Sequence, residues 1–254
     1  MALITVIRDL HRRKARERRG LALAEGVRLV EEMVATRAPC KGAAVSPSLE
    51  PTPRGAALRL ALVAANVPLA DVSDDELRDI AATDHPQGIV AVYQQKAWEL
   101  SHLIPGPQRP LVILDAVQDP GNVGTIARTA LAFGASGLIA LPGTADLTNP
   151  KTVRAAMGAL FRLPHLHAGD DVVLEALRTA GTMVWATAMD GESIGAVSVV
   201  GPIALVLGNE GAGVRAELLA HASKRVTIPI CAEAESLNVA IAAGIMLHYI
   251  ARRS

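Results

Sequence analysis

The sequence predicts a two-part α/β protein whose C-terminal part is built on a mostly parallel β-sheet. The chain has 254 residues, enough for one large domain or two smaller ones. Apolar residues make up 50% of it, which is ample for a buried core. Short apolar runs alternate with segments of helical periodicity, a pattern typical of parallel strands covered by helices on both faces.

The N-terminal part, residues 1–95, begins with a concentration of basic side chains. Residues 8–19 contain seven basic and two acidic residues, whereas the rest of the chain has 18 basic and 23 acidic ones. Such a patch is typical of a surface for a polyanion, although a solvated helix face has the same composition.

The remaining N-terminal elements follow from periodicity and turn residues. Apolar residues at helical spacing predict one helix over 20–36, and Ser73 with Glu76 forms the pattern of a capping box. We expect strands at 41–46, 67–73 and 88–95, and further helices at 55–66 and 74–83.

Residues 96–110 contain three prolines and little periodicity, so we interpret 96–108 as a linker. The second domain then covers 109–254. We expect its strands at 111–117, 137–142, 182–188, 202–208 and 225–230, and its helices at 125–133, 153–161, 172–180, 214–222 and 236–253.

Three of the expected strands are followed by unusual polar loops, at the sheet edge where ligands bind in open parallel sheets. The first, DPGNVGTIARTA, has turn residues at 119–122 and carries Asn122 and Arg128. We expect its helix to open at Gly124-Thr125, with Arg128 on the first turns. The second, LGNEGAGV, surrounds Glu210 with glycines, which allow the backbone to approach a ligand closely.

The third loop, AEAESLNVAIAAG, precedes the most apolar helix of the chain. Ser236 suits the N-cap of that helix, and Asn238 would then lie in its first turn. Capping therefore explains Ser236 and leaves Asn238 unexplained. Together the loops gather polar side chains without a nucleophile–base pair.

Several other chemistries fit the sequence poorly. The glycines do not form GxGxxG, so nicotinamide binding is disfavoured. Cys40 and Cys231 cannot form a disulfide framework, and His165 and His167 have no evident third metal ligand. We treat Cys231 as a small buried hydrophobe rather than a nucleophile. Neither a signal peptide nor a membrane span is expected, and a reducing cytoplasm is the default location.

The three loops together resemble the signature motifs of the SpoU (TrmH-type) RNA 2′-O-ribose methyltransferases of the SPOUT superfamily. The matching stretches are DPGNVGTIARTALAFGASG, LVLGNEGAGV and IPICAEAESLNVAIAAGIML. The N-terminal stretches RRKARERRGLALAEGVRLVEE and HPQGIVAV are similar to the L30e-like substrate-binding domain of that family. The likeness therefore covers nearly the whole chain.

The resemblance implies a C-terminal α/β domain with a deep trefoil knot, S-adenosylmethionine as methyl donor, no metal, and a homodimer formed through that domain. It implies donor contacts at Leu207, Gly208, Ile228 and Leu237, and catalytic roles for Asn122, Arg128, Glu210, Ser236 and Asn238. Phosphate contacts are then expected from Arg12, Arg13, Lys14, Arg16 and Arg19. Structured 23S rRNA is the expected substrate; a tRNA methyltransferase and a non-catalytic RNA-binding protein of the same fold are the alternatives.

Overall fold

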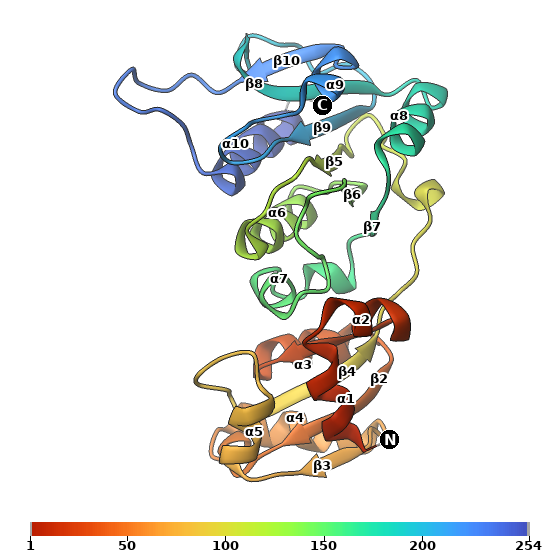
Figure 1. The fold of residues 1–254 in the computed structure, drawn as a ribbon, viewed down its shortest axis with the longest axis vertical. Helices are drawn as coiled ribbons and strands as arrows, with labels where there is room; N and C mark the ends of the chain where they lie inside the picture. Colours follow the sequence, from red (N-terminus) through yellow and green to blue (C-terminus); the bar gives the residue numbers. More distant parts are fainter. Residues whose placement is uncertain (1, 253–254) are drawn as a thin grey trace. The chain divides into compact units, whose positions relative to one another are not determined.

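The computed structural model describes residues 2–252 and divides the chain into two compact units (Figure 1). One unit comprises the chain up to Ala97 together with Thr148–Phe161, and the other comprises Trp98–Leu147 together with the residues from Arg162 onward. A segment from the middle of the sequence therefore packs with the N-terminal unit.

The N-terminal unit is built on a four-stranded sheet with the order β1-β4-β2-β3, in which only β2 and β3 run parallel. Its strands are β1 (Leu21–Glu25), β2 (Cys40–Val45), β3 (Leu69–Asp71) and β4 (Ile89–Gln94). Its helices are α1 (Leu3–Leu10), α2 (Arg13–Arg19), α3 (Val27–Ala35), α4 (Pro53–Ala64), α5 (Asp74–Ile80) and α7 (Pro150–Ala155), with short 3₁₀ turns at Pro47–Leu49 and Ala159–Phe161.

Two predictions for this unit have different outcomes. The capping box of α5 is confirmed, since the Ser73 hydroxyl accepts from Glu76 N and the Glu76 carboxylate accepts from Ser73 N. The single helix over 20–36 is wrong, because Leu21–Glu25 is a strand paired with β4. Gly26, with φ +96°, separates this strand from α3, so the helical spacing of the apolar residues there was coincidental.

The second unit is a six-stranded sheet with the order β10-β8-β9-β5-β6-β7, and every neighbouring pair is parallel. The strands are β5 (Leu111–Leu114), β6 (Gly137–Ala140), β7 (His165–His167), β8 (Met183–Ser193), β9 (Ile203–Leu207) and β10 (Lys224–Thr227). The helices are α6 (Pro120–Ala132), α8 (Asp170–Thr179), α9 (Ala216–Ala220) and α10 (Val239–Arg252), with a 3₁₀ turn at Leu100–Leu103. The predicted parallel sheet is confirmed, and β7 is an additional edge strand.

Alternating residues of these strands form the core. Ile113, Ile139 and Val206 pack against α8 and α9 in one buried cluster. On the other side, α6 and α10 pack together, with the Phe133 and His248 rings edge to face at 5.6 Å. Leu103 is 1% exposed and belongs to the same buried cluster, so the proline-rich segment after Trp98 is packed into the second unit rather than free. Within residues 2–252, no helix has the length and apolarity needed to span a bilayer.

Candidate active site

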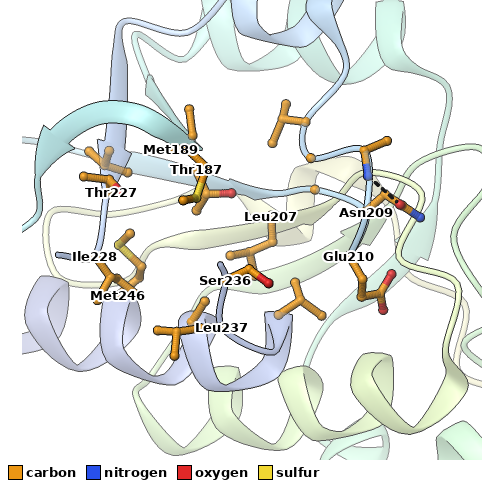
Figure 2. A pocket seen from close by; sticks show the side chains of 18 of the residues that line it. Thr187, Met189, Leu207, Asn209, Glu210, Thr227, Ile228, Ser236, Leu237 and Met246 are labelled. Carbon is orange, nitrogen blue, oxygen red and sulfur yellow. Dashed lines mark hydrogen bonds between the residues drawn. The ribbon is translucent and has the colours of Figure 1, made fainter. Parts of the chain in front are cut away.

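A cavity of about 640 Å³ lies at the carboxyl ends of β9 and β10 (Figure 2). Residues of β8 and α10 also line it. This volume is in the range of sites for small organic ligands, roughly 300–1,000 Å³. The lining includes all four residues expected to hold a donor: Leu207, Gly208, Ile228 and Leu237. The strand order explains the convergence, because β10, β8, β9 and β5 are consecutive in the sheet and their carboxyl ends share one edge.

The glycine loop, residues 208–214, forms one wall of this cavity. Its backbone closes on itself, since Asn209 N donates to Gly213 O at 3.0 Å and Gly213 N donates to Asn209 O at 2.9 Å. A Cβ added to Gly208 would lie 2.2 Å from Val214 N, so this position requires glycine. Gly213 has φ +72°, which also favours glycine. Figure 2 shows Asn209 and Glu210 at the start of this loop.

A chain of side-chain hydrogen bonds joins the three loops. Asn238 Nδ2 donates to Asn122 Oδ1 at 3.0 Å, and Asn122 Nδ2 donates to Glu210 Oε1 at 2.9 Å. These three residues are far apart in the sequence and lie before α10, in α6 and after β9. The structure therefore brings three of the five expected catalytic residues into direct contact.

The third loop caps α10 differently from the prediction. The helix begins at Val239, and Asn238 Oδ1 accepts from Ala240 N at 2.9 Å and from Ile241 N at 3.3 Å. Asn238 is therefore the capping residue, and the assignment of that role to Ser236 was wrong. Ser236 is exposed and lines the cavity next to Leu237 (Figure 2).

The first loop is shorter than predicted, because α6 begins at Pro120 and not at Gly124-Thr125. Asp119 caps the helix by accepting from Asn122 N at 2.9 Å, and proline suits the first helical position. Arg128 consequently lies beyond the second turn of α6, not on its first turns. It is exposed and does not line the cavity, and its side chain makes no hydrogen bond or ion pair with any part of the chain that the structure describes.

Sequence reasoning missed one wall of the cavity. Residues 187–190, in the second half of β8, line it together with the three loops. The prediction ended this strand at residue 188, although a fourth strand end on the same edge was a signal that could have been used.

Cys231 is exposed, which contradicts its assignment as a buried hydrophobe. Among residues 2–252, no three side chains that could bind a metal ion lie together. Burial of the His165 ring lowers its pKa.

The basic residues of the N-terminal unit divide into exposed and buried groups. Arg12, Arg13 and Lys14 are exposed, and Arg19 is half-buried. Arg19 Nε donates to Asp9 Oδ2 at 2.9 Å, and hydrogen bonds from Arg19 and then Arg12 hold the pKa of Asp9 below its usual value.

Arg16 does not fit the expected phosphate contact. It is 2% exposed, and its Nη1 donates to Leu10 O and His11 O, both at 2.8 Å. Its Nε donates to Thr148 Oγ1 at 3.1 Å. The prediction is corrected for this residue, which holds α1, α2 and the segment after residue 147 together.

The open parallel sheet, with a ligand-sized cavity at its carboxyl edge and polar side chains at the cavity mouth, defines the second unit as an α/β domain that binds a small molecule. Comparison with known proteins specifies the class further. Residues 109–248 match the SpoU rRNA Methylase family, and residues 2–91 match the MRM3-like substrate binding domain.

The similarity to individual relatives covers nearly the whole chain. The 23S rRNA (guanosine(2553)-2′-O)-methyltransferase RlmP of Bacillus subtilis is 33% identical over 96% of this chain and 93% of its own. The AdoMet-bound rRNA methyltransferase from Sinorhizobium meliloti has a TM-score of 0.87 and 34% identity, covering 98% of this chain and 94% of its own. The SpoU methyltransferase AviRb from Streptomyces viridochromogenes, in complex with AdoMet, has a TM-score of 0.88 and 29% identity, covering 99% and 97%.

This chain belongs to the SpoU rRNA methylase family. The family resemblance read from the three loops is thereby confirmed. The trefoil knot that the family implies stays a prediction.

Proposed function

We propose that this protein transfers a methyl group from S-adenosylmethionine to a ribose 2′-hydroxyl of 23S rRNA. The observation that carries the proposal is the hydrogen-bond chain from Asn238 through Asn122 to Glu210, a residue that lines a cavity of about 640 Å³. The RlmP relative, 33% identical over 96% of this chain, supports the same reaction and the same RNA. We propose the bacterial cytoplasm, where rRNA is modified, as the location.

The cavity fits such a donor in its chemistry. Leu207, Ile228 and Met246 give it apolar walls, and the glycine loop exposes backbone groups that can bind an adenosyl moiety. The donor supplies a methyl group on a positively charged sulfur. Among the lining residues are Asp190, Glu210 and Glu235, and there is no lysine or arginine in that lining, which suits a cationic ligand.

The chain's own residues align the acceptor hydroxyl with the methyl group of the donor. A guanidinium stays protonated in proteins, so Arg128 orients the nucleotide through a phosphate rather than acting as a simple base. Asn122 and Glu210 hold the ribose in line, and Ser236 and Asn238 fix the hydroxyl. Holding the hydroxyl and the methyl group of the donor in this alignment raises the rate of transfer.

Transfer assays with purified RNA test the proposal. Wild-type protein should methylate 23S rRNA and form a 2′-O-methyl nucleotide that is missing from cells lacking the gene. Arg128→Ala should lose transfer and keep donor affinity, whereas Arg178→Ala, which changes an exposed arginine on α8, should keep both transfer and donor affinity. Methylation of tRNA instead of rRNA, or donor binding without transfer to any RNA, would contradict the proposal and favour the corresponding alternative.

We also propose that Arg12, Arg13, Lys14 and Arg19 contact RNA phosphates. Each phosphate contact makes affinity more dependent on salt, by a slope of about one per contact. Arg13→Glu with Lys14→Glu should weaken RNA binding and flatten its salt dependence. Arg78→Glu, an exposed arginine on α5 of the same unit, is the control. Equal salt slopes for the two variants would contradict these contacts.

We propose a homodimer formed through the second unit. Ile241 and Ile245, four residues apart on α10, are 57% and 40% exposed, and exposed apolar clusters mark association surfaces. The double substitution Ile241→Lys and Ile245→Lys should give a monomer by sedimentation, whereas Val172→Lys, at a valine that is 62% exposed on α8, should not. An unchanged dimer with both α10 substitutions would place the interface elsewhere.

A further inference from the structure

Each polar atom of Asn209, in its backbone and in its side chain, makes at least one hydrogen bond. Its backbone exchanges two hydrogen bonds with Gly213. Its side-chain oxygen accepts from Gly211 N at 2.9 Å and from Ala212 N at 3.0 Å. Its side-chain nitrogen donates to Ala116 O at 2.9 Å. The last bond leaves the loop and reaches the segment that follows β5.

A second tie joins the far end of the same loop to the same segment. Arg215 N donates to Asp115 Oδ2 at 2.8 Å, and Arg215 Nε donates to Asp115 Oδ1 at 2.5 Å. Asp115 is fully buried, whereas the Arg215 side chain is 38% exposed. Ala116 has φ +55°, a left-handed conformation that is uncommon for a residue with a side chain. The loop is thus held at both ends by two consecutive residues.

These ties determine where Glu210 lies. Glu210 is exposed, and the hydrogen bond from Asn122 Nδ2 is its only one to another part of residues 2–252. Its side chain is therefore not fixed by packing. Asn122 lies at the start of α6, a few residues after Ala116. The Asn209–Ala116 bond therefore joins the chain segment that carries Glu210 to the segment that carries Asn122.

We propose that Asn209 is a positioning residue for methyl transfer, which acts by keeping Glu210 within hydrogen-bond distance of Asn122. The inference rests on the proposed function, since it concerns the rate of that reaction. Asn209 does not act on the substrate itself. Its effect passes through Glu210, so the contributions of the two residues to the rate are not independent.

The substitution Asn209→Asp removes only the hydrogen bond to Ala116 O. Its carboxylate still accepts from Gly211 N and Ala212 N, but it has no N–H to donate to Ala116 O. Single-turnover transfer should fall by about tenfold or more in the wild-type background, and by less than about twofold in a Glu210→Ala background, which has no side chain to accept from Asn122, because interacting residues are non-additive. Asn149→Asp is the matched control, since Asn149 Oδ1 accepts from Lys151 N at 2.9 Å in the other unit.

Two results would overturn the inference: a rate for Asn209→Asp within about twofold of wild type, or equal losses from Asn209→Asp in both backgrounds. If Asn209→Asp does not fold by circular dichroism, Asn209→Ser goes through the same cycle, because a hydroxyl can accept from the loop amides and is too short to reach Ala116. Wild-type protein without transfer activity would instead refute the proposed function. The two failures are thus distinguishable.

Discussion

Asn238 has two separable roles, and separating them gives the sharpest prediction. Its side-chain oxygen caps α10 by accepting from Ala240 N and Ile241 N, and its side-chain nitrogen donates to Asn122. Asn238→Ala removes both interactions. Asn238→Asp keeps the oxygen acceptor and removes only the donor. The two variants should therefore differ in stability and agree in loss of activity.

The magnitudes follow from the contacts. Loss of a side-chain N-cap costs about 1 kcal/mol, which for a chain of this length lowers the Tm by roughly 2–4 °C. A carboxylate at the same position still caps, and its charge is favourable at a helix N-terminus by about 0.3–1 kcal/mol. Asn238→Asp should therefore unfold within about 2 °C of wild type. Its carboxylate would face Asn122 Oδ1, an acceptor, so the bond between these side chains is lost.

Calorimetric unfolding and single-turnover transfer measure the two roles on the same samples. We expect both variants to lose about tenfold or more in rate, the factor that corresponds to about 1.4 kcal/mol of transition-state stabilisation. Asn149→Ala removes the cap of α7 in the other unit and should lower stability while leaving transfer intact. A wild-type rate for Asn238→Asp would refute the reasoning, because the donor to Asn122 would then be dispensable.

Three further predictions concern residues outside this chain of hydrogen bonds. Arg16→Met should destabilise the N-terminal unit by about 2–3 kcal/mol in denaturant unfolding, because the carbonyls of Leu10 and His11 lose a charged donor, and should leave the salt slope of RNA binding unchanged; a reduced slope would restore Arg16 as a phosphate contact. Arg215→Met should cost about 1–3 kcal/mol by calorimetry, since one oxygen of the buried Asp115 carboxylate loses its charged donor while Arg215 itself is partly exposed; no measurable loss would contradict that role. Cys231 is exposed, whereas burial raises the pKa of Cys40, so iodoacetamide near pH 8 should label Cys231 first in peptide mass spectra, and equal labelling would be the contrary result.

The fold class and most strands were predictable because they depend on local patterns. The predicted strands at 111–117, 137–142 and 202–208 each contain an uninterrupted apolar run (LVIL, LIAL and IALVL), as expected for strands buried on both faces. Residues 20–36 failed for the opposite reason. LALAE and VRLVEEMVA both place apolar residues at helical spacing, and only the pairing of Leu21–Glu25 with β4, more than 60 residues later, makes the first of them a strand.

The sequence indicated residues that meet in the structure, but it did not predict how they contact one another. Asn122, Glu210 and Asn238 were singled out as polar residues in loops at strand ends, and they proved to be hydrogen-bonded to one another. Their individual geometry was not predictable. A two-residue difference in where α10 begins exchanges the capping role between Ser236 and Asn238, and element boundaries carry little local signal.

The sequence by itself determined the parallel sheet, the three polar loops and the family, since residue type, spacing and order are properties of the chain alone. Only the tertiary structure decided which polar groups meet. Arg16 is a cation in a basic run by sequence, yet folding buries it beneath carbonyls of residues 10 and 11 and beside Thr148. Asn209 is one polar residue among glycines, yet the segment that follows the neighbouring strand β5 gives its amide a partner at Ala116. Hydrogen bonds act over about 3 Å, and distances of that kind between segments a hundred residues apart exist only after the strands have been ordered in the sheet.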